Sequence, residues 1–469
     1  MKAKAPKKKI SKYNIKSQWN YLTYTNKGML KIEGWWADEL VKKVGTPAYI
    51  IVERKIRERL RLFKKAIPYP KLRVQYASKV NSNLEILKIV REEGCELDAS
   101  SVGEIILGLL ADFDPGQITY TNLYKSEQDI YFAAKIGVQS ITADSIEELR
   151  RMEQVGKKLD TKIKTFIRVN PLITLGKYST RDHQYGIPIT QVKNAINFAI
   201  KSDNLDLVGF HFHGAYITTP QVYFIAAEKL IKLAKYATLN RANIKYIDLG
   251  GGFPVESDKE FSVEDMGEKF SNHFTKLLKQ YGLPRLTLIF EPGKSIVMTA
   301  GIGLTKVVSN KKLPKVEKVI VDGSTYAFVP DPLVYHCYYD ILPANKMVSP
   351  QIKTYTIAGC TCDSIDIIGS NRRMPKLEEG DILAIMDCGA YSNVMASNFN
   401  TLKKAPMVMI KEDDSLKVIR RRDRYSEMFA PELDVLKMAD SKELKKLYDI
   451  YRLNIDKLWV GKQKNGSPQ

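Results

Sequence analysis

The sequence predicts a (β/α)₈ TIM-type barrel joined to a second, all-β domain. Strand-like apolar runs alternate with amphipathic helical runs from Ala48–Val52 to about residue 290, which gives about eight or nine βα units. That span of about 240 residues is typical of a closed barrel. Beyond Glu291-Pro292-Gly293 the pattern changes to short strand-like runs separated by turns, which indicates a β-sandwich or β-barrel. These later runs are 302–308, 316–322, 353–358, 382–386 and 406–410.

Length and composition are those of a soluble globular protein with room for two domains. The chain has 469 residues, of which 44% are hydrophobic and 27% are charged. No apolar run approaches the ~20 residues that a membrane span requires, and the basic start MKAKAPKKK is not followed by the apolar core of a secretory signal. The five cysteines lack metal-ligand spacing. We therefore expect reduced thiols and a cytoplasmic protein.

The net charge of +20 raises the question of a nucleic-acid partner. Lysines are spread along the whole chain with acidic residues between them, and no nucleic-acid-binding motif accompanies them. A basic proteome or an anionic ligand explains the charge equally well. We do not expect nucleic acid to be the main partner.

Lys79 is the first candidate for chemistry. The strand-like run Leu72–Ala77 ends just before it, and capping residues then precede a helical run. A lysine at the carboxyl end of a strand can reach into a cavity and form an imine with a carbonyl cofactor. The ordinary alternative is a solvated surface charge, so the hypothesis depends on partners from elsewhere in the chain.

Other polar or glycine-rich positions also follow predicted strands. In a barrel the carboxyl ends of all strands meet at one mouth, so these residues are expected to converge there. Three consecutive glycines at such a position let backbone N–H groups approach a phosphate without a Cβ in the way. The strand-end residues are Lys79, Asp98, Arg168, His211, His213, Gly250–Gly252 and Glu291.

Glu291 and the two histidines each permit a specific chemistry. A carboxylate at position 291 could keep a pyridine nitrogen protonated, which makes the ring a strong electron sink. His211 and His213 lie two residues apart on one strand, a spacing that a metal pair could use. The sequence offers no third ligand with suitable spacing, so we expect no metal.

Eight segments in order along the chain resemble the motifs of one enzyme family. They are YASKVN (76–81), ELDASSVGE (96–104), GFHFH (209–213), DLGGGFP (248–254), EPGK (291–294), CDSID (362–366), GAYSNVMASNFN (389–400) and IRRRD (419–423). Together they resemble the fold-type III, pyridoxal-phosphate-dependent decarboxylases that act on diaminopimelate, ornithine, lysine or arginine, with the diaminopimelate enzymes as the main model. The resemblance extends from about residue 30 to about residue 435.

The resemblance implies a domain layout and an assembly. It implies a barrel over residues 48–290 and a β domain formed by residues 21–47 and 291–460. Residues 1–20 are expected to be a flexible basic tail, and residues 461–469 a polar tail. Enzymes of this family are head-to-tail homodimers, so the active site is expected at the subunit interface.

The resemblance also implies pyridoxal 5'-phosphate (PLP) as cofactor and a role for each site residue. Lys79 is expected to carry the Schiff base, and Cys362 to protonate the quinonoid carbanion that remains after CO₂ loss. His213 is expected to stack on the cofactor ring, and Glu291 to bind its nitrogen. The expected cofactor contacts are Lys79, Asp98, Arg168, His213, Gly251, Gly252, Glu291, Lys294 and Tyr391. The expected substrate contacts are Asp331, Tyr335, Asp363 and Tyr391.

Departures from the family pattern bear on the substrate. Diaminopimelate decarboxylases have an arginine where this sequence has Asp331, and the arginine of their EPGR turn is Lys294 here. An acidic residue in place of a carboxylate-binding arginine reverses the local charge preference. Asp363 matches the ornithine and lysine enzymes, and Ala215-Tyr216 replaces a Gly-Ser phosphate contact. We therefore expect a basic amino acid such as ornithine or lysine rather than meso-diaminopimelate.

Other functions remain open at this point. One is a decarboxylase of an amino-acid conjugate in siderophore or other specialised metabolism, and another is a true diaminopimelate decarboxylase in lysine biosynthesis. Glu291 argues against an amino-acid racemase of the same fold, which would have an arginine at the ring nitrogen. More remote alternatives are a catalytically inactive regulatory homologue and a nucleic-acid-binding protein.

Overall fold

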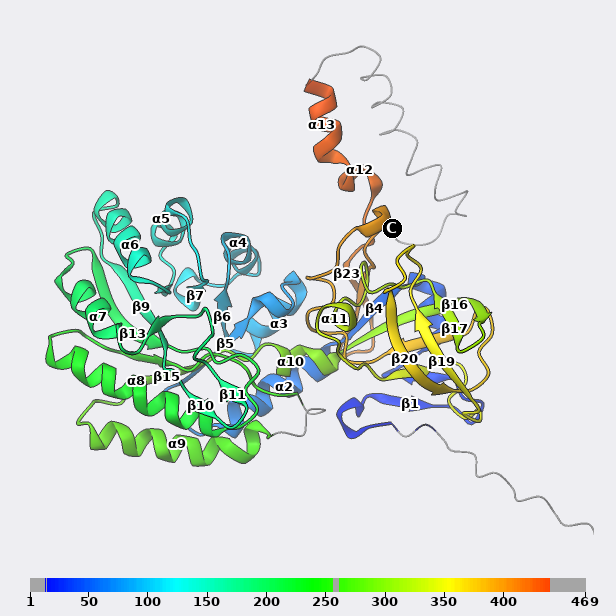
Figure 1. Cartoon of the computed structure of the whole chain (residues 1–469), viewed down its shortest axis with the longest axis horizontal. Helices are drawn as coiled ribbons and strands as arrows, with labels where there is room; N and C mark the ends of the chain where they lie inside the picture. Colours follow the sequence, from blue (N-terminus) through cyan, green and yellow to red (C-terminus); the bar gives the residue numbers. More distant parts are fainter. Residues whose placement is uncertain (1–12, 14, 256–260, 439–469) are drawn as a thin grey trace, which may run out of the picture. The chain divides into compact units, whose positions relative to one another are not determined.

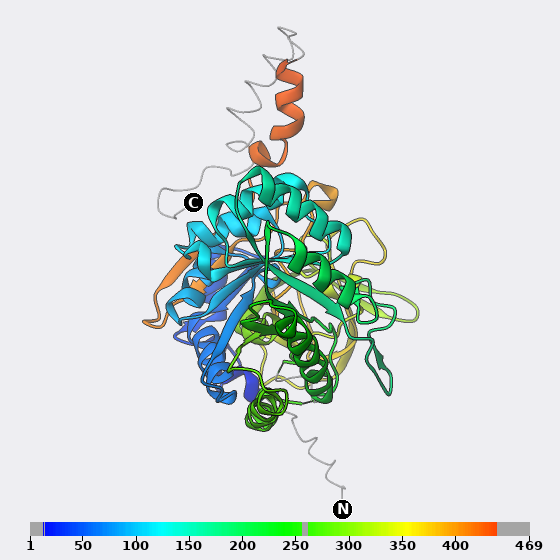
Figure 2. The same cartoon turned by 90° about the vertical axis from the view of Figure 1, so that its left-hand side faces the viewer.

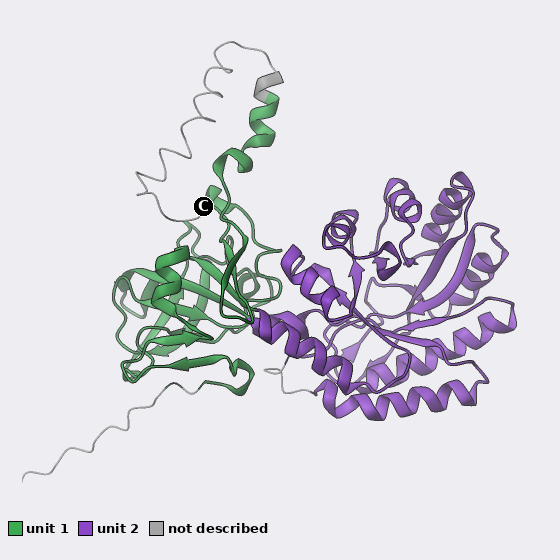
Figure 3. Ribbon diagram, turned by 180° about the vertical axis from the view of Figure 1, so that it is seen from behind, with its two compact units in different colours: residues 1–52, 301–469 green, residues 53–300 purple. Residues whose placement is uncertain are grey.

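The protein divides into two compact units. A computed structural model describes residues 13, 15–255 and 261–438, which Figure 1 colours along the sequence. One unit is Glu53–Ala300, and the other combines Met1–Val52 with Gly301–Gln469 (Figure 3). Among the described residues, every helix is too short or too polar to cross a membrane.

The unit Glu53–Ala300 is a closed barrel of eight parallel strands, which confirms the predicted fold class. Each strand pairs with the next in chain order, and β15 pairs with β5 to close the ring. Figure 2 shows the strands at the centre with the helices around them. The strands are β5 (Leu72–Ala77), β6 (Glu96–Ala99), β7 (Ile118–Thr121), β8 (Ser140–Ala143), β9 (Ile163–Asn170), β13 (Leu205–His211), β14 (Tyr246–Asp248) and β15 (Thr287–Phe290).

In the described part of the chain, seven helices of the outer ring follow the barrel strands β5 to β14, and an eighth precedes the first strand. The eighth, α2 (Glu53–Ala66), packs against α9 and α3 and so fills the remaining place in the outer ring. Gly267 of α9 permits this packing, because a Cβ there would collide with the carbonyl oxygen of Ala66. The other helices are α3 (Leu84–Glu92), α4 (Val102–Leu110), α5 (Glu127–Ile136), α6 (Ile146–Lys158), α7 (Val192–Lys201), α8 (Gln221–Leu239) and α9 (Val263–Gln280).

Side-chain caps fix the loops that leave the carboxyl ends of the strands. Beyond β5, the amide oxygen of Asn83 accepts a hydrogen bond from the backbone N–H of Glu85 at 3.0 Å. Beyond β6, Ser101 caps α4 in the same way through the N–H of Glu104. Because each cap sets where its helix begins, the short loops that carry polar strand-end residues follow defined paths. Further caps are Ser126 of α5, Ser145 of α6 and Ser262 of α9.

Several short elements complete the barrel unit. Gly186 leads into β12, which extends the sheet beside β9. The elements are the strands β10 (Thr174–Leu175), β11 (Tyr178–Ser179) and β12 (Ile187–Pro188), the helix α10 (Lys294–Val297), and the 3₁₀ turns Ser78–Val80, Pro115–Gln117 and Met298–Ala300.

The second unit is built mainly from β-strands, as predicted. Its large sheet has the order β20-β19-β17-β16-β4-β22-β23, and β21 joins β16 to β18. A three-stranded sheet of β1 to β3 packs its apolar residues into the same core. The strands are β1 (Leu22–Tyr24), β2 (Leu30–Ile32), β3 (Trp35–Trp36), β4 (Ala48–Val52), β16 (Gly301–Lys312), β17 (Glu317–Val321), β18 (Ile341–Pro343), β19 (Lys353–Ala358), β20 (Ile367–Met374), β21 (Ile382–Ile385), β22 (Met407–Ile410) and β23 (Leu416–Arg420). The helices are α1 (Ala37–Val44), α11 (Asp331–Val334), α12 (Tyr425–Met428) and α13 (Ala430–Met438), and two 3₁₀ turns are Ser17–Trp19 and Phe399–Thr401.

The first predicted barrel strand belongs to the other unit. We expected Ala48–Val52 to open the barrel at residue 48, but this strand pairs with β16 and β22 of the β unit. All five of its residues are buried there, and an apolar run of this kind suits a central strand of either sheet. The barrel unit accordingly begins at Glu53 and ends at Ala300, rather than spanning 48–290.

Gln18 and Trp19, which we expected within the flexible tail 1–20, are buried in the β unit. Trp19 is 1% exposed in the core of the β unit, and its indole N–H donates to Asp387 at 2.8 Å. Gln18 is buried beside it. Residues 1–12 of the expected tail, the helical segments expected over 439–460 and the tail 461–469 lie outside the described residues.

Candidate active site

Lys79 lies at the barrel mouth in contact with a buried carboxylate. It follows β5 in a 3₁₀ turn, and its Nζ is 3.0 Å from Oδ2 of Asp98, which lies near the end of the neighbouring strand β6. Asp98 is fully buried, whereas the Lys79 side chain is 34% exposed. Ser78 fixes the turn, because its hydroxyl donates to the carbonyl of Asp98 and to Glu104. The amine of Lys79 is thus partly accessible, and its contact with Asp98 fixes its position.

The carboxyl group of Asp98 has an unusual affinity for protons. Burial raises its pKa from 3.8 to about 7, and the negative charge of Glu291 acts in the same direction, against the opposing effect of Lys79. Asp98 therefore titrates near neutral pH in the cofactor-free protein.

This shift predicts a pH-dependent stability for the cofactor-free protein. Between about pH 4 and pH 7 the folded state binds more protons at Asp98 than the unfolded state, so rising pH lowers the free energy of unfolding. By pH 8 this effect lowers the free energy of unfolding by on the order of 4 kcal/mol relative to pH values below about 4. We expect Asp98→Asn to remove that part of the pH dependence in denaturant titrations at pH 5 and pH 8. The exposed Asp203→Asn is the control, and an unchanged pH slope in Asp98→Asn would contradict the assignment.

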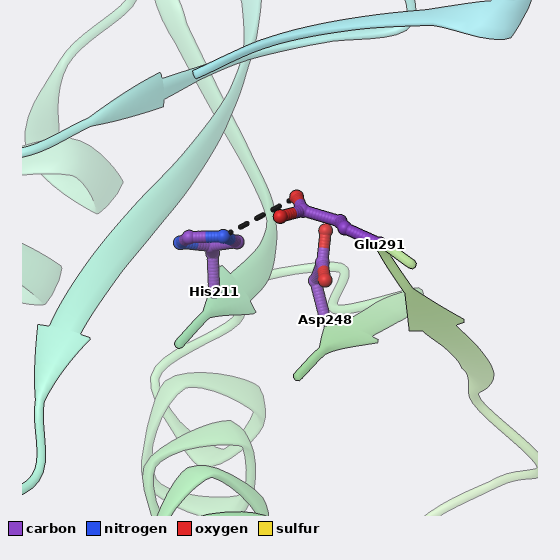
Figure 4. A group of neighbouring side chains, drawn as sticks. All are labelled: His211, Asp248 and Glu291. Atoms are coloured by element: carbon purple, nitrogen blue, oxygen red, sulfur yellow. Dashed lines mark ion pairs between the residues drawn. The ribbon is translucent and has the colours of Figure 1, made fainter. Parts of the chain in front are cut away.

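His211, Asp248 and Glu291 form a compact buried group at the ends of β13, β14 and β15. Nε2 of His211 is 3.3 Å from Oε1 of Glu291, and one ligand atom from each of the three residues lies within 4.8 Å of the others. Figure 4 shows Asp248 directed toward the other two side chains. Their residue types could also hold a metal ion. The sequence analysis found no third metal ligand, because these residues are far apart in the chain and only the closed ring brings them together.

The two carboxyl groups of this cluster differ in their affinity for protons. Burial and the negative charge of Glu291 raise the pKa of Asp248 well above its usual range. Burial alone would raise the pKa of Glu291, but the neighbouring His211 ring and the Lys79 ammonium group lower it further than burial raises it. Glu291 therefore carries the negative charge of the group.

The glycine loop after β14 holds the ring of His213. The backbone N–H of Gly251 donates to Nδ1 of His213 at 3.1 Å, which leaves the proton of the neutral ring on Nε2. Burial, together with the charges of Lys79 and Arg168, lowers the pKa of His213 well below its ordinary value. The N–H of Gly251 is thus engaged by His213, and the expected contact of Gly251 with a phosphate stays a prediction.

Arg168 belongs to a network of charged residues that sequence analysis did not find. Its guanidinium group lies 3.0 Å from the buried Asp144, and stacks over the ring of Tyr185 at 4.6 Å. The backbone N–H of Asp144 donates to Glu148, which also pairs with the fully buried Lys125 at 3.0 Å. In a sequence these charged residues resemble a solvated surface, and only the ring of strands reveals that they are buried.

The predicted residues beyond the barrel strands lie in two places. Lys294 begins α10 of the barrel unit and is partly buried. Asp363 and Cys362 lie on an exposed loop of the β unit, where the hydroxyl of Tyr326 donates to Asp363 at 2.5 Å. That hydroxyl lowers the pKa of Asp363. Tyr391 lies in the same unit with a left-handed backbone, φ 53°.

Asp331, an expected substrate contact, is buried within the β unit. It begins α11 of the β unit, is 4% exposed, and accepts a hydrogen bond from Tyr339 at 3.0 Å. One carboxylate oxygen is thus paired within its own unit, and a contact of Asp331 with substrate stays a prediction. Tyr335, in contrast, is 49% exposed one residue beyond the same helix.

Comparisons with known proteins identify the family. Residues 53–298 match the family described as pyridoxal-dependent decarboxylase, pyridoxal binding domain. The diaminopimelate decarboxylase of Methanothermobacter thermautotrophicus is 31% identical over 415 residues, which cover 86% of this chain and 95% of that protein. The enzyme of Bacillus subtilis with the same name is 30% identical over 419 residues, with 86% and 94% coverage. The crystal structure of diaminopimelate decarboxylase from M. jannaschii in complex with L-lysine superposes with a TM-score of 0.82, at 26% identity and with 88% and 98% coverage.

The barrel site fits PLP. Oε1 of Glu291 is buried 3.3 Å from Nε2 of His211, but the two atoms are not aligned as a hydrogen bond, so this oxygen can accept from a protonated pyridine nitrogen. Glycine is required in the loop Gly250–Gly252, where the backbone packs closely against its neighbours, since a Cβ at Gly250 or Gly251 would collide with a neighbouring carbonyl oxygen. The accessible amine of Lys79 lies at the same mouth. The chain belongs to the fold-type III pyridoxal-dependent decarboxylases, and it is a carboxy-lyase of amino acids that uses PLP.

Proposed function

We propose that this enzyme releases CO₂ from meso-diaminopimelate and leaves lysine as the product. The observation that carries the proposal is similarity along nearly the whole chain to proteins named diaminopimelate decarboxylase from archaea and bacteria, at 29–31% identity. The related structure from M. jannaschii contains L-lysine, the compound that remains when diaminopimelate loses one carboxylate.

The positions of two residues also support this substrate. Our sequence argument for a basic amino acid depended in part on Asp331, but this carboxylate is buried and accepts a hydrogen bond from Tyr339. It is therefore a poor candidate for repelling a distal carboxylate. Lys294 keeps a positive charge where the family turn has arginine, and a cation there suits the second carboxylate of diaminopimelate.

Each site residue has a definite part in the proposed reaction. When bound, PLP supplies an aldehyde that condenses with amines and a ring that accepts electron density. Lys79 provides the amine that holds the cofactor, and Glu291 keeps a proton at the pyridine nitrogen. His213, fixed by Gly251, provides a neutral ring to lie against the cofactor. Cys362 supplies the proton that replaces the lost carboxylate.

We further propose that the working form is a homodimer in which the loop of Cys362 and Asp363 completes the site of the partner chain. The exposure of Cys362 and the partial exposure of Asp363 in the single chain support this proposal. Mixing equal amounts of Lys79→Ala chains and Cys362→Ala chains should restore about a quarter of the wild-type CO₂ release. About half of the dimers are then mixed, and one of the two sites in each mixed dimer is intact.

A second candidate is a decarboxylase of ornithine, lysine or arginine. The observation in its favour is Asp363, a partly exposed carboxylate with a lowered pKa, of the type that binds a distal amine. A decarboxylase of a larger amino-acid conjugate belongs to the same class of alternatives.

One substrate panel distinguishes these functions. CO₂ release is measured with meso- and L,L-diaminopimelate, both hands of lysine and ornithine, arginine, and citrate-linked diamino acids. We expect kcat/KM for meso-diaminopimelate to exceed every other value by at least about 100-fold, the discrimination that a paired distal group gives. A higher kcat/KM for ornithine or lysine would overturn the proposal in favour of the second candidate. Lys294→Met should raise KM for diaminopimelate more than KM for a slow basic substrate.

A further inference from the structure

The loop that carries Cys362 is held rigidly by one buried carboxylate. Asp366 is 2% exposed, and its Oδ1 accepts from the backbone N–H and the hydroxyl of Thr325 at 2.7 and 2.8 Å. Its Oδ2 accepts from the N–H and the hydroxyl of Thr361 at 3.1 and 2.7 Å. The segment between Gly359 and Asp366 is therefore fixed at both ends, and Cys362 protrudes from it at a defined position.

The side-chain amide of Asn400 forms two hydrogen bonds with Cys362. Its amide oxygen accepts from the backbone N–H of Cys362 at 3.1 Å, and its Nδ2 lies 3.3 Å from the Sγ of the same residue. The backbone of Asn400 is left-handed, with φ 54° and ψ 23°, a conformation that asparagine and aspartate tolerate better than most residues. The amide is thus presented to the cysteine from a specific turn of the chain.

We propose that Asn400 is the positioning residue for the Cys362 thiol and that its N–H stabilises the sulfur when it carries negative charge. A hydrogen bond to the charged form of a group favours that form. The same amide orients the thiol, because its oxygen fixes the backbone from which the side chain extends. Its part in catalysis rests on the proposed function of Cys362 as the proton donor.

In that step the S–H bond breaks and a C–H bond forms at the Cα that has lost CO₂. The electron pair of the S–H bond stays on sulfur as a thiolate, and a proton from water restores the thiol before the next turnover. Asn400 donates to the sulfur throughout this step. The amide thereby lowers the energy of the state in which the proton has left.

The replacement Asn400→Asp removes the donor and places a negative charge beside the sulfur, and both changes disfavour the thiolate. Aspartate keeps an oxygen that can accept from the N–H of Cys362 and tolerates the left-handed backbone, but it lacks the N–H that faces sulfur. Asn371→Asp is the matched control, since Asn371 is an exposed residue of the same unit with the same φ of 54°. Cys360, on the same loop, is an internal reference because its thiol donates to the carbonyl of Asp322 instead.

The measurement is the rate of alkylation by iodoacetamide at pH 7.5, followed separately for Cys362 and Cys360 in the PLP-bound enzyme by mass spectrometry. We expect Asn400→Asp to slow alkylation of Cys362 by about tenfold, as the loss of one hydrogen bond to a charged group predicts. Alkylation of Cys360 should be unchanged, and Asn371→Asp should react like the wild type at both cysteines.

Two results would overturn the inference. One is an unchanged or faster alkylation of Cys362 in Asn400→Asp, and the other is a parallel change at Cys360, which would mean that Asn400 acts on the loop as a whole. Alkylation requires no substrate, so it is independent of the proposed function. If Cys362→Ser kept full CO₂ release, the role of the thiol as proton donor would fail, while slower alkylation in Asn400→Asp would still support the positioning role.

Discussion

Replacement of Lys79 by alanine is expected to reduce CO₂ release at least about 10⁴-fold, which corresponds to roughly 5.4 kcal/mol of lost transition-state stabilisation. The amine lies 3.0 Å from Asp98 at the mouth of the barrel, and it is the group that we propose bonds to the cofactor. Without it, PLP is held by contacts alone, and each substrate amine must react with a free aldehyde. The absorbance of the enzyme-bound imine should disappear in the same variant.

The control for this variant is Lys164→Ala. Lys164 is an exposed lysine of β9 whose neighbours in the strand are buried, so its loss tests the effect of removing one lysine from the same barrel. We expect wild-type absorbance and turnover from that control. Normal CO₂ release by Lys79→Ala would show that another amine carries the cofactor and would refute the site. An added primary amine such as methylamine should restore part of the lost rate, because it supplies the missing group.

The barrel and much of its mouth could be predicted because parallel strands leave a simple pattern. Strands covered on both faces are continuous apolar runs, and each run ends where a polar residue faces the mouth. Lys79, Asp98, Arg168 and Glu291 were identified in this way, and the ring of strands brings them to one end.

The uniform apolar pattern of buried strands also explains why Ala48–Val52 was assigned to the wrong sheet. Ala48–Val52 is apolar throughout, and a run of five buried residues does not reveal which sheet contains it. Its partners, β16 and β22, lie about 250 and 350 residues further along the chain, and their register decides the assignment. The eighth place in the outer ring is filled by α2, which precedes the first barrel strand.

Contacts that depend on burial could not be predicted from residue type. Asp331 occupied a position that pointed to the substrate, yet it is buried and bonded to Tyr339. Lys125 and Glu148 resembled surface charges but form a buried pair in the network that reaches Arg168. Asn400 stood within a recognised motif, and its role emerged only when the loop of Cys362 was seen beside it.

Glu291 is the second residue whose replacement should have a large effect. Glu291→Gln is expected to lower kcat by about 10²–10³-fold while the imine absorbance is retained, because Lys79 is intact. Glutamine matches the shape of glutamate but is neutral, so it cannot favour a protonated pyridine nitrogen. The neighbouring carboxyl groups of Asp98 and Asp248 strengthen this expectation. The pKa values of both are raised, and the negative charge of Glu291 contributes to each increase.

The distinction between binding and electronic roles makes this test specific. If Glu291 acts on the ring nitrogen, Glu291→Gln should lower kcat and alter the absorbance spectrum of the bound cofactor. The affinity for PLP should change by less than about tenfold. The control Glu268→Gln alters an exposed glutamate of α9 and should leave both readouts unchanged. Loss of PLP with a normal rate after reconstitution would instead assign Glu291 to cofactor binding. A further consequence follows for Asp98, whose pKa should fall in Glu291→Gln because the neighbouring negative charge that raises it has been removed.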